Sequence, residues 1–212
     1  MSDLIIFGLP PSSYVRTARM ICANKGVEHT LQPVDFRSTA YQADHHPFSR
    51  MPALQHGDVK LYECLAIGTY VDEAFDGPAL QPGDPVGRAQ MMQWISATND
   101  YIYSVIVGEC VIERFVKPMR GLDPDEDAIA AAVPKIAHQL DVVERQLEQT
   151  AYLAGDTLTF ADLFLAPVLH YLAATPEGAQ LLPQRTMVSK WLDQMQQTPD
   201  FGTINAMGGN SP

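Results

Sequence analysis

The feature that most constrains this chain of 212 residues is that its strand signals are confined to residues 1–80. Short apolar runs at Leu4 to Phe7 and Thr30 to Val34 are bounded by Gly and Pro residues, as buried strands often are. Between them, apolar residues recur at helical spacing from Tyr14 to Asn24. The order strand, helix, strand predicts two parallel strands joined by a crossover helix.

Two further strands are predicted to form a hairpin. Pro52 to Gln55 and Val59 to Tyr62 flank His56-Gly57-Asp58, a sequence typical of a tight turn. A helix follows from Glu63 to Phe75 and is expected to end before a Gly-Pro pair. We therefore predict an α/β domain at residues 1–80.

The rest of the chain is predicted to be all helical. After a linker rich in Pro and Gly at Leu80 to Pro85, we expect helices at Gly87–Val116, Pro124–Gln149, Phe160–Ala173 and Val188–Gln197. The second of these carries a single apolar stripe, and Pro134 lies inside it, so a kink or a late start is expected there. We assign the all-helical domain to residues 86–205.

Composition excludes several classes of protein. Hydrophobic residues make up 46% and charged residues 18%, as in an ordinary globular protein. No apolar run approaches the roughly 20 residues of a membrane span, and the first residues do not resemble a signal peptide. The formal net charge of −11 disfavours binding to nucleic acid or to anionic membranes. We expect a soluble, cytoplasmic protein.

Cysteines and histidines give no sign of a metal or a disulfide framework. Cys22, Cys64 and Cys110 are far apart and odd in number, and no CxxC pair is present. The six histidines show no metal-binding spacing, and the adjacent His45 and His46 are expected to be structural or on the surface. We predict no metal.

Three segments carry the candidate chemistry. Ser12 and Ser13 stand between the first strand and the first helix, where a hydroxyl can cap the helix or help its N-terminus to stabilise an anion. Arg50-Met51-Pro52 opens a strand, where a cis Met51–Pro52 bond would turn the Met51 backbone toward a peptide ligand. Glu63-Cys64 opens a helix whose N–H groups can meet a carboxylate while Glu63 holds an ammonium; an acidic first turn that only favours the helix dipole is the alternative.

These segments, taken in order, resemble the cytosolic glutathione transferases. The thioredoxin-like half of that family is matched by Phe7 to Ser12, Pro47 to Leu54 and Leu61 to Ile67, and its helical half by Tyr152 to Asp156 and Thr159 to Asp162. The resemblance runs over nearly the whole chain and is closest to serine-type members of the phi, theta and zeta kind found in bacteria. Thr159-x-x-Asp162 also has the spacing of a capping box, which fixes a buried helix.

The resemblance implies a role for each site residue. Ser12 would activate the thiol of glutathione, with Ser13 and then Tyr14 as alternatives. The backbone of Met51 would bind the cysteinyl amide, and Glu63 and Cys64 would hold the γ-glutamyl end. Arg50 and, with less support, Arg37 would neutralise ligand carboxylates. Cys64 departs from the family, which usually has Ser there, and so replaces a good side-chain donor by a weak one.

The activity implied is a detoxifying transfer, in which glutathione attacks a hydrophobic electrophile as its thiolate. A serine instead of a cysteine at the first helix argues against redox exchange, which needs a protein thiolate. Two alternatives stay open: a glutathione-dependent isomerase of the maleylacetoacetate type, suggested by Ser12-Ser13, and a binding protein without turnover. The electrophile is expected beside the helix from Gly87 to Val116, and Phe48, an aromatic in an otherwise polar loop, suggests a homodimer.

Overall fold

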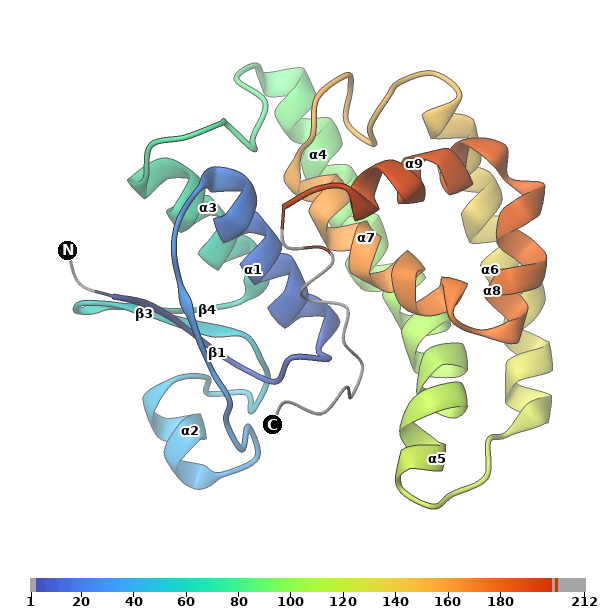
Figure 1. The fold of residues 1–212 in the computed structure, drawn as a ribbon, viewed down its shortest axis with the longest axis horizontal. Helices are drawn as coiled ribbons and strands as arrows, with labels where there is room; N and C mark the ends of the chain where they lie inside the picture. Colours follow the sequence, from blue (N-terminus) through green and yellow to red (C-terminus); the bar gives the residue numbers. More distant parts are fainter. Residues whose placement is uncertain (1–2, 200, 202–212) are drawn as a thin grey trace. The chain divides into compact units, whose positions relative to one another are not determined.

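The computed structural model describes residues 3–199 and 201, and it divides into two compact units. The first comprises the described residues up to Leu80 together with those from Gln196 onward, and the second runs from Gln81 to Met195. Residues 202–205, which we assign to the helical domain from sequence, lie outside the described residues. As predicted, the first part is α/β and the second is all helical (Figure 1).

A four-stranded mixed sheet with the order β2-β1-β3-β4 forms the centre of the first unit. β1 (Leu4–Phe7) pairs in parallel with β2 (Thr30–Gln32), with Ile6 opposite Leu31. β3 (Ala53–His56) pairs antiparallel with both β1 and β4 (Val59–Tyr62), and the last two form the predicted hairpin. β2 ends two residues earlier than the sequence pattern predicts.

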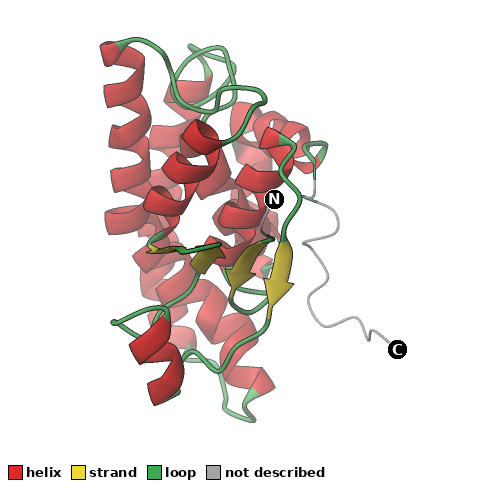
Figure 2. Cartoon of the chain, turned by 90° about the vertical axis from the view of Figure 1, so that its left-hand side faces the viewer, coloured by secondary structure: helices red, strands yellow, loops and turns green. Residues whose placement is uncertain are grey.

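Helices cover both faces of this sheet. α1 (Ser13–Lys25) and α3 (Cys64–Ala74) pack together on one face, and α2 (Thr39–Asp44) lies on the other (Figure 2). Because side chains alternate along a strand, Ile6 of β1 is buried on one face, while Phe7 packs with Tyr41 of α2 on the other. The fold thus places the starts of α1 and α3 next to strand ends.

The C-terminal end of α1 is fastened by a buried ion pair. Lys25 Nζ lies 2.9 Å from Asp72 Oδ1 of α3 and also donates to the carbonyl oxygens of Gly77 (3.4 Å) and Pro78 (3.2 Å). The same Asp72 oxygen accepts from the backbone N–H of Leu80 at 3.0 Å. The segment that leaves α3 is therefore held against α1 by groups that are all paired, as buried charges require.

The second unit consists of helices alone. They are α4 (Pro85–Ala97), η1 (Thr98–Ile102), η2 (Ser104–Val116), α5 (Lys117–Met119), α6 (Glu126–Leu147), α7 (Phe160–Ala173), α8 (Pro176–Leu181), η3 (Leu182–Gln184) and α9 (Thr186–Gln196). Twelve of the fourteen residues of α7 are buried, so this helix is the core of the unit. α6 continues through Pro134, and no helix of the described residues is long and apolar enough to cross a bilayer.

The long helix predicted from Gly87 changes its winding after α4. η1 and η2 are π-helical, and within this stretch the carbonyl oxygen of Tyr101 accepts from the Ser104 hydroxyl and from Gln139 Nε2 of α6, each at 3.0 Å. Apolar periodicity predicts that a helix forms here, but it does not distinguish these two windings.

Candidate functional site

Ser12 is the N-cap of α1, yet its hydroxyl does not cap that helix. The residue has φ −71° and ψ 126°, its backbone N–H donates to the Leu9 carbonyl at 3.0 Å, and its own carbonyl accepts from Arg16 at 2.9 Å. Its side chain makes no hydrogen bond to the first turn and is half-buried. A serine at an N-cap usually accepts such a bond, so this hydroxyl remains available to a ligand.

Other helix starts in the described residues use a side chain where α1 does not. The acceptors are Ser38 for α2, Asp84 for α4, Asp125 for α6, Asp162 for α7, Thr175 for α8 and Glu144 for α9. The N-cap of α3, Glu63, also makes no capping bond. α1 and α3 are thus two helix starts that have no side-chain cap and carry predicted glutathione-binding residues, and the N-terminus of a helix favours an anion.

The Met51 segment lies against the Ser12 loop. The Met51–Pro52 peptide bond is cis, which confirms the prediction from the sequence. The Met51 sulfur accepts from the backbone N–H of Leu9 at 3.3 Å, so the loop before α1 and the loop before β3 are in direct contact. Two of the three predicted segments therefore meet at this point.

Glu63 has an unusual backbone conformation where β4 passes into α3. Its φ of 71° lies in the left-handed region, which non-glycine residues adopt only when the surrounding structure enforces it. Its side chain is 65% exposed, and Nε2 of His46 lies 3.9 Å from Oε1 of Glu63. The carboxylate is thus presented to solvent at the N-terminus of a helix, where it can accept a cation.

The thiol of Cys64 points into the protein. It is buried, and its Sγ donates to the carbonyl oxygen of Tyr14 in the first turn of α1 at 3.4 Å. Burial raises the pKa of the Cys64 thiol well above its usual value, and the neighbouring Glu63 raises it further, so the thiol is neutral. Only the backbone N–H of Cys64 can serve a ligand, while its side chain joins α3 to the start of α1.

The remaining predicted residues are placed differently. Ser13 is buried in the first turn of α1, where its carbonyl accepts from Thr17 Oγ1 at 3.1 Å. Arg50 is exposed next to Met51. Arg37 is also exposed, with its guanidinium carbon 5.4 Å from the ring centre of Phe36. Described contacts bring Met51 and Cys64 to the Ser12 loop, but none of them brings Arg37 there.

The position of His46 beside Glu63 is what sequence reasoning missed. We expected a structural or surface role, and its ring is indeed buried beside the ring of Tyr62, at 5.0 Å between centroids, but it also faces Glu63. The sequence offers no signal for this placement, because Tyr62 and Glu63 are brought to His46 only by the packing of β4 on the sheet.

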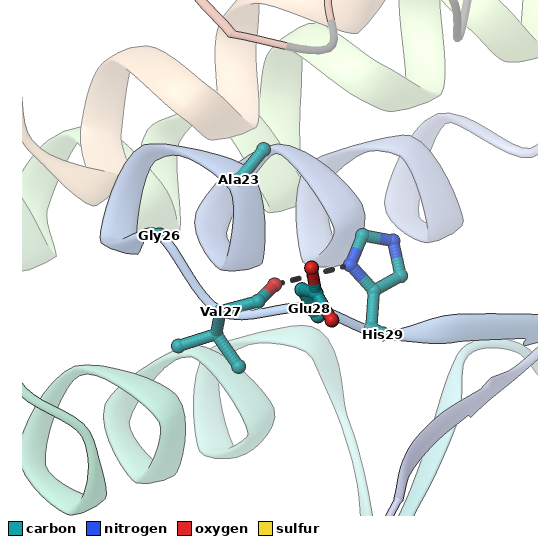
Figure 3. A pocket seen from close by; sticks show the side chains of 5 residues that line it. All are labelled: Ala23, Gly26, Val27, Glu28 and His29. Atoms are coloured by element: carbon teal, nitrogen blue, oxygen red, sulfur yellow. Dashed lines mark hydrogen bonds between the residues drawn. The ribbon is translucent and has the colours of Figure 1, made fainter.

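A hollow elsewhere in the first unit does not belong to this site. Ala23, Gly26, Val27, Glu28 and His29 line it where the chain leaves α1, and Nδ1 of His29 lies 3.5 Å from the Val27 carbonyl oxygen (Figure 3). It is at the opposite end of α1 from Ser12, and it is open to solvent. Its position gives it no part in the chemistry of the Ser12 loop.

Comparison with known proteins identifies similar domains along the chain. A model of the glutathione S-transferase N-terminal domain matches residues 6–79, and one of the C-terminal domain matches residues 103–199. The chain is 30% identical to "Probable glutathione S-transferase GSTF1" of Oryza sativa subsp. japonica, over 98% of this chain and 97% of the relative. It is 29% identical to "Glutathione S-transferase 1" of Triticum aestivum, over 94% and 92%.

A solved structure shows the same architecture. The crystal structure of glutathione transferase F7 from Populus trichocarpa has a TM-score of 0.86 and 29% identity, and it covers 95% of this chain and 97% of that one. The predicted fold class, a thioredoxin-like N-terminal part followed by an all-helical part, is thereby confirmed.

Proposed function

Because the chain belongs to the glutathione S-transferase family and is a glutathione transferase, we propose that Ser12 activates the thiol of bound glutathione. The observation that carries this proposal is the hydroxyl of Ser12, which stands at the start of α1 without making a capping bond. A thiolate placed there would accept from the hydroxyl and would lie at the positive end of the helix.

The expected magnitudes are sufficient for this role. A free cysteine thiol titrates near ~8.5, and each unit of depression corresponds to about 1.4 kcal/mol. A hydrogen bond to a charged acceptor contributes about 1.5–3 kcal/mol, and a helix N-terminus adds about 0.3–1. Together they are sufficient to lower the pKa of the thiol by about one to two units without a separate base.

The reaction then follows from the thiolate. The thiol proton leaves to solvent, the sulfur lone pair forms a carbon–sulfur bond with a hydrophobic electrophile, and a leaving group departs with its electron pair or a strained ring opens. The protein supplies proximity and a stabilised nucleophile. Glutathione is a co-substrate here, and among the described residues no cluster of metal-binding side chains is present.

The rest of glutathione is assigned to the two neighbouring segments. The Met51 backbone binds the cysteinyl amide, and Arg50 neutralises a ligand carboxylate. Glu63 holds the α-ammonium of the γ-glutamyl group, and the backbone N–H of Cys64 binds its carboxylate. Contacts of Met51 with Leu9 and of Cys64 with Tyr14 support this assignment, because both lead to the Ser12 loop. Ser13 and Arg37 are weaker contributors, since one is buried and the other is 5.4 Å from the Phe36 ring.

Several broader properties are proposed on the same basis. The chain is assigned to the serine-type members of the family, with a glutathione-binding domain at residues 1–80 and a helical domain at 86–205. The three cysteines are free thiols, which supports a cytoplasmic location.

Phe48 is 68% exposed and packs edge-on to Tyr62, which supports a homodimer that buries this ring. A monomer in sedimentation at micromolar concentration would contradict the dimer.

The thiol role is tested by Ser12→Ala, with Ser13→Ala as the matched variant. For Ser12→Ala we expect kcat/KM for an aryl halide to fall about 10- to 100-fold, and the pKa of bound glutathione to rise by about one to two units. The affinity for glutathione should change little. The thiolate absorbance of bound glutathione against pH measures the shift directly. If Ser13→Ala gave the larger effect, the role would pass to Ser13; if neither variant changed the pKa, the proposal would be wrong.

A further inference from the structure

We propose that His46 is a positioning residue for glutathione, which holds the carboxylate of Glu63 where the α-ammonium of the γ-glutamyl group binds. This inference rests on the proposed role of Glu63 and deepens it. Nothing in the sequence assigns a part in binding to His46, whose adjacent neighbour His45 packs instead on the ring of Phe7 at 4.0 Å between centroids.

The Glu63 carboxylate needs such a contact because little else fixes it. Its backbone φ of 71° sets the direction in which the side chain leaves the chain, but the side chain itself is 65% exposed. Within the described part of the chain, His46 is the one group at ion-pair distance from its carboxylate, with Nε2 at 3.9 Å from Oε1. An exposed glutamate that is free to rotate would lose conformational entropy on binding an ammonium, and a fixed partner reduces that loss.

His46 is itself held rigidly. Its side chain is 2% exposed, and the rings of Tyr62 and Phe48 lie 5.0 Å and 6.4 Å from it between centroids. Its backbone N–H donates to Tyr41 at 3.1 Å, and its carbonyl accepts from Ser49 at 2.9 Å. The imidazole therefore presents a fixed Nε2 to Glu63.

The two ring nitrogens of His46 differ in a way that determines the proton's position. Nδ1 is buried without a hydrogen-bond partner among the described residues, whereas Nε2 faces the carboxylate. A neutral ring therefore carries its proton on Nε2, since a buried donor without an acceptor is costly. Burial lowers the pKa of His46, Glu63 and the backbone of His46 itself oppose this, and Arg50 lowers it further. A neutral Nε2–H attracts the carboxylate without cancelling the negative charge that the ligand ammonium needs.

The test compares three variants and two ligands. His46→Phe keeps a ring of similar shape but removes the N–H, and His46→Gln keeps an N–H near the place of Nε2. His45→Phe is the matched control, because it removes the adjacent imidazole, which has no contact with Glu63. Dissociation constants are measured by calorimetry for glutathione and for glutaryl-cysteinyl-glycine, the analogue without the α-amino group.

For His46→Phe we expect the dissociation constant of glutathione to rise about threefold to fivefold, as for a partly exposed charged contact, and that of the amine-free analogue to stay unchanged. His46→Gln should restore part of the loss, His45→Phe should have no effect, and Glu63→Gln should make the His46→Phe change disappear. Equal weakening of both ligands would indicate a merely structural role and overturn the inference. If Glu63→Gln itself left glutathione binding unchanged, the proposed role of Glu63 would fail; if only His46→Phe had no effect, the positioning role alone would fail.

Discussion

The starts of α1 and α7 use the same kind of residue for opposite purposes. At α7, Thr159 and Asp162 form the predicted capping box: Asp162 Oδ2 accepts from the backbone N–H and from the hydroxyl of Thr159, each at 3.0 Å. At α1, Ser12 occupies the corresponding N-cap position and its hydroxyl makes no such bond. The first arrangement satisfies donors of the helix start with its own side chains, whereas the hydroxyl of Ser12 satisfies none at the start of α1.

This difference separates stability from function within one chain. Asp162 is completely buried and its four hydrogen bonds also include Leu153 N–H at 2.9 Å and Trp191 Nε1 at 3.1 Å. Glu63, at the start of α3, is mostly exposed, and within the described part of the chain only His46 lies at ion-pair distance from its carboxylate. A helix start that is closed by its own side chains contributes stability, and one that is left open costs stability but can bind an anion.

The largest expected effect is on folding, from Asp162→Ala. This change leaves four donors without an acceptor in a buried place, so the free energy of unfolding should fall by about 3 kcal/mol or more. Burial raises the pKa of Asp162, but the four donors oppose this, and we expect them to keep the carboxylate as their acceptor. Urea unfolding followed by circular dichroism measures the loss. Asp162→Asn should lose less, because Oδ1 can still accept from Leu153 and Trp191.

A loss below about 1 kcal/mol for Asp162→Ala would contradict the stabilising role of the capping box at the start of α7. The pKa of bound glutathione gives a second test of the contrast between the starts of α7 and α1. In the fraction of Asp162→Asn protein that is folded, the pKa of bound glutathione should stay at its original value, since the hydrogen bonds of Asp162 are all made within the helical unit.

The next largest expected effect is on the pH dependence of stability, and it comes from the carboxylate of Glu177 in the first turn of α8. Arg114 lies 2.6 Å from Glu177 Oε1, and its hydrogen bonds lower the pKa of Glu177. A carboxyl whose folded pKa is depressed contributes stability above its unfolded value of about 4.3, and this is lost as the pH falls through the folded pKa. Glu177→Gln should therefore cost about 1.5 kcal/mol at neutral pH and flatten the fall in stability at acid pH.

Glu63→Gln is the matched variant for that experiment. It removes a carboxylate from another helix start, but this one is 65% exposed and lies 3.9 Å from His46 Nε2, so the free energy of unfolding should change little. Unfolding curves at pH values from neutral to acid compare the two variants. If the free energy of unfolding depended on pH equally in both variants, the contact of Arg114 with Glu177 would not account for the loss of stability in acid.

The sequence predicts the parts of the fold that rest on local patterns. Alternation and turn residues identify β1, β3 and β4, and the Thr159-x-x-Asp162 spacing predicts the start of α7. α2 was missed because only Tyr41 of its six residues is buried, so it has no apolar periodicity. α8 was missed although its signal is present, with Thr175 as N-cap and Pro176 at the first helical position.

The site could be predicted only in part, because some of its features depend on packing between distant segments. Ser12, Met51 and Glu63 are recognised from their places at strand ends and helix starts. The buried ring of His46 requires Tyr62, which comes 16 positions later in the chain. The inward turn of the Cys64 thiol requires the Tyr14 carbonyl of another helix. No local pattern contains these contacts.

The smallest expected effect is the sharpest test of the comparison, because it concerns two serines in the same unit. Ser38 caps α2 by accepting from the Tyr41 N–H at 3.2 Å, and its hydroxyl also donates to the Asp35 carbonyl at 2.8 Å. Ser38→Ala should therefore cost about 1 kcal/mol of unfolding free energy, the usual value for a lost N-cap. Ser12→Ala removes no capping bond and should cost less than about 0.5 kcal/mol.

The two variants should then rank in opposite order in stability and in catalysis. Ser38→Ala should lower the unfolding midpoint in urea and leave the pKa of bound glutathione in place, whereas Ser12→Ala should do the reverse. If Ser12→Ala destabilised the protein as much as Ser38→Ala, its hydroxyl would be capping α1 in solution. In that case the hydroxyl would not be available to the thiolate, and the contrast between the open start of α1 and the closed start of α7 would no longer explain the activity.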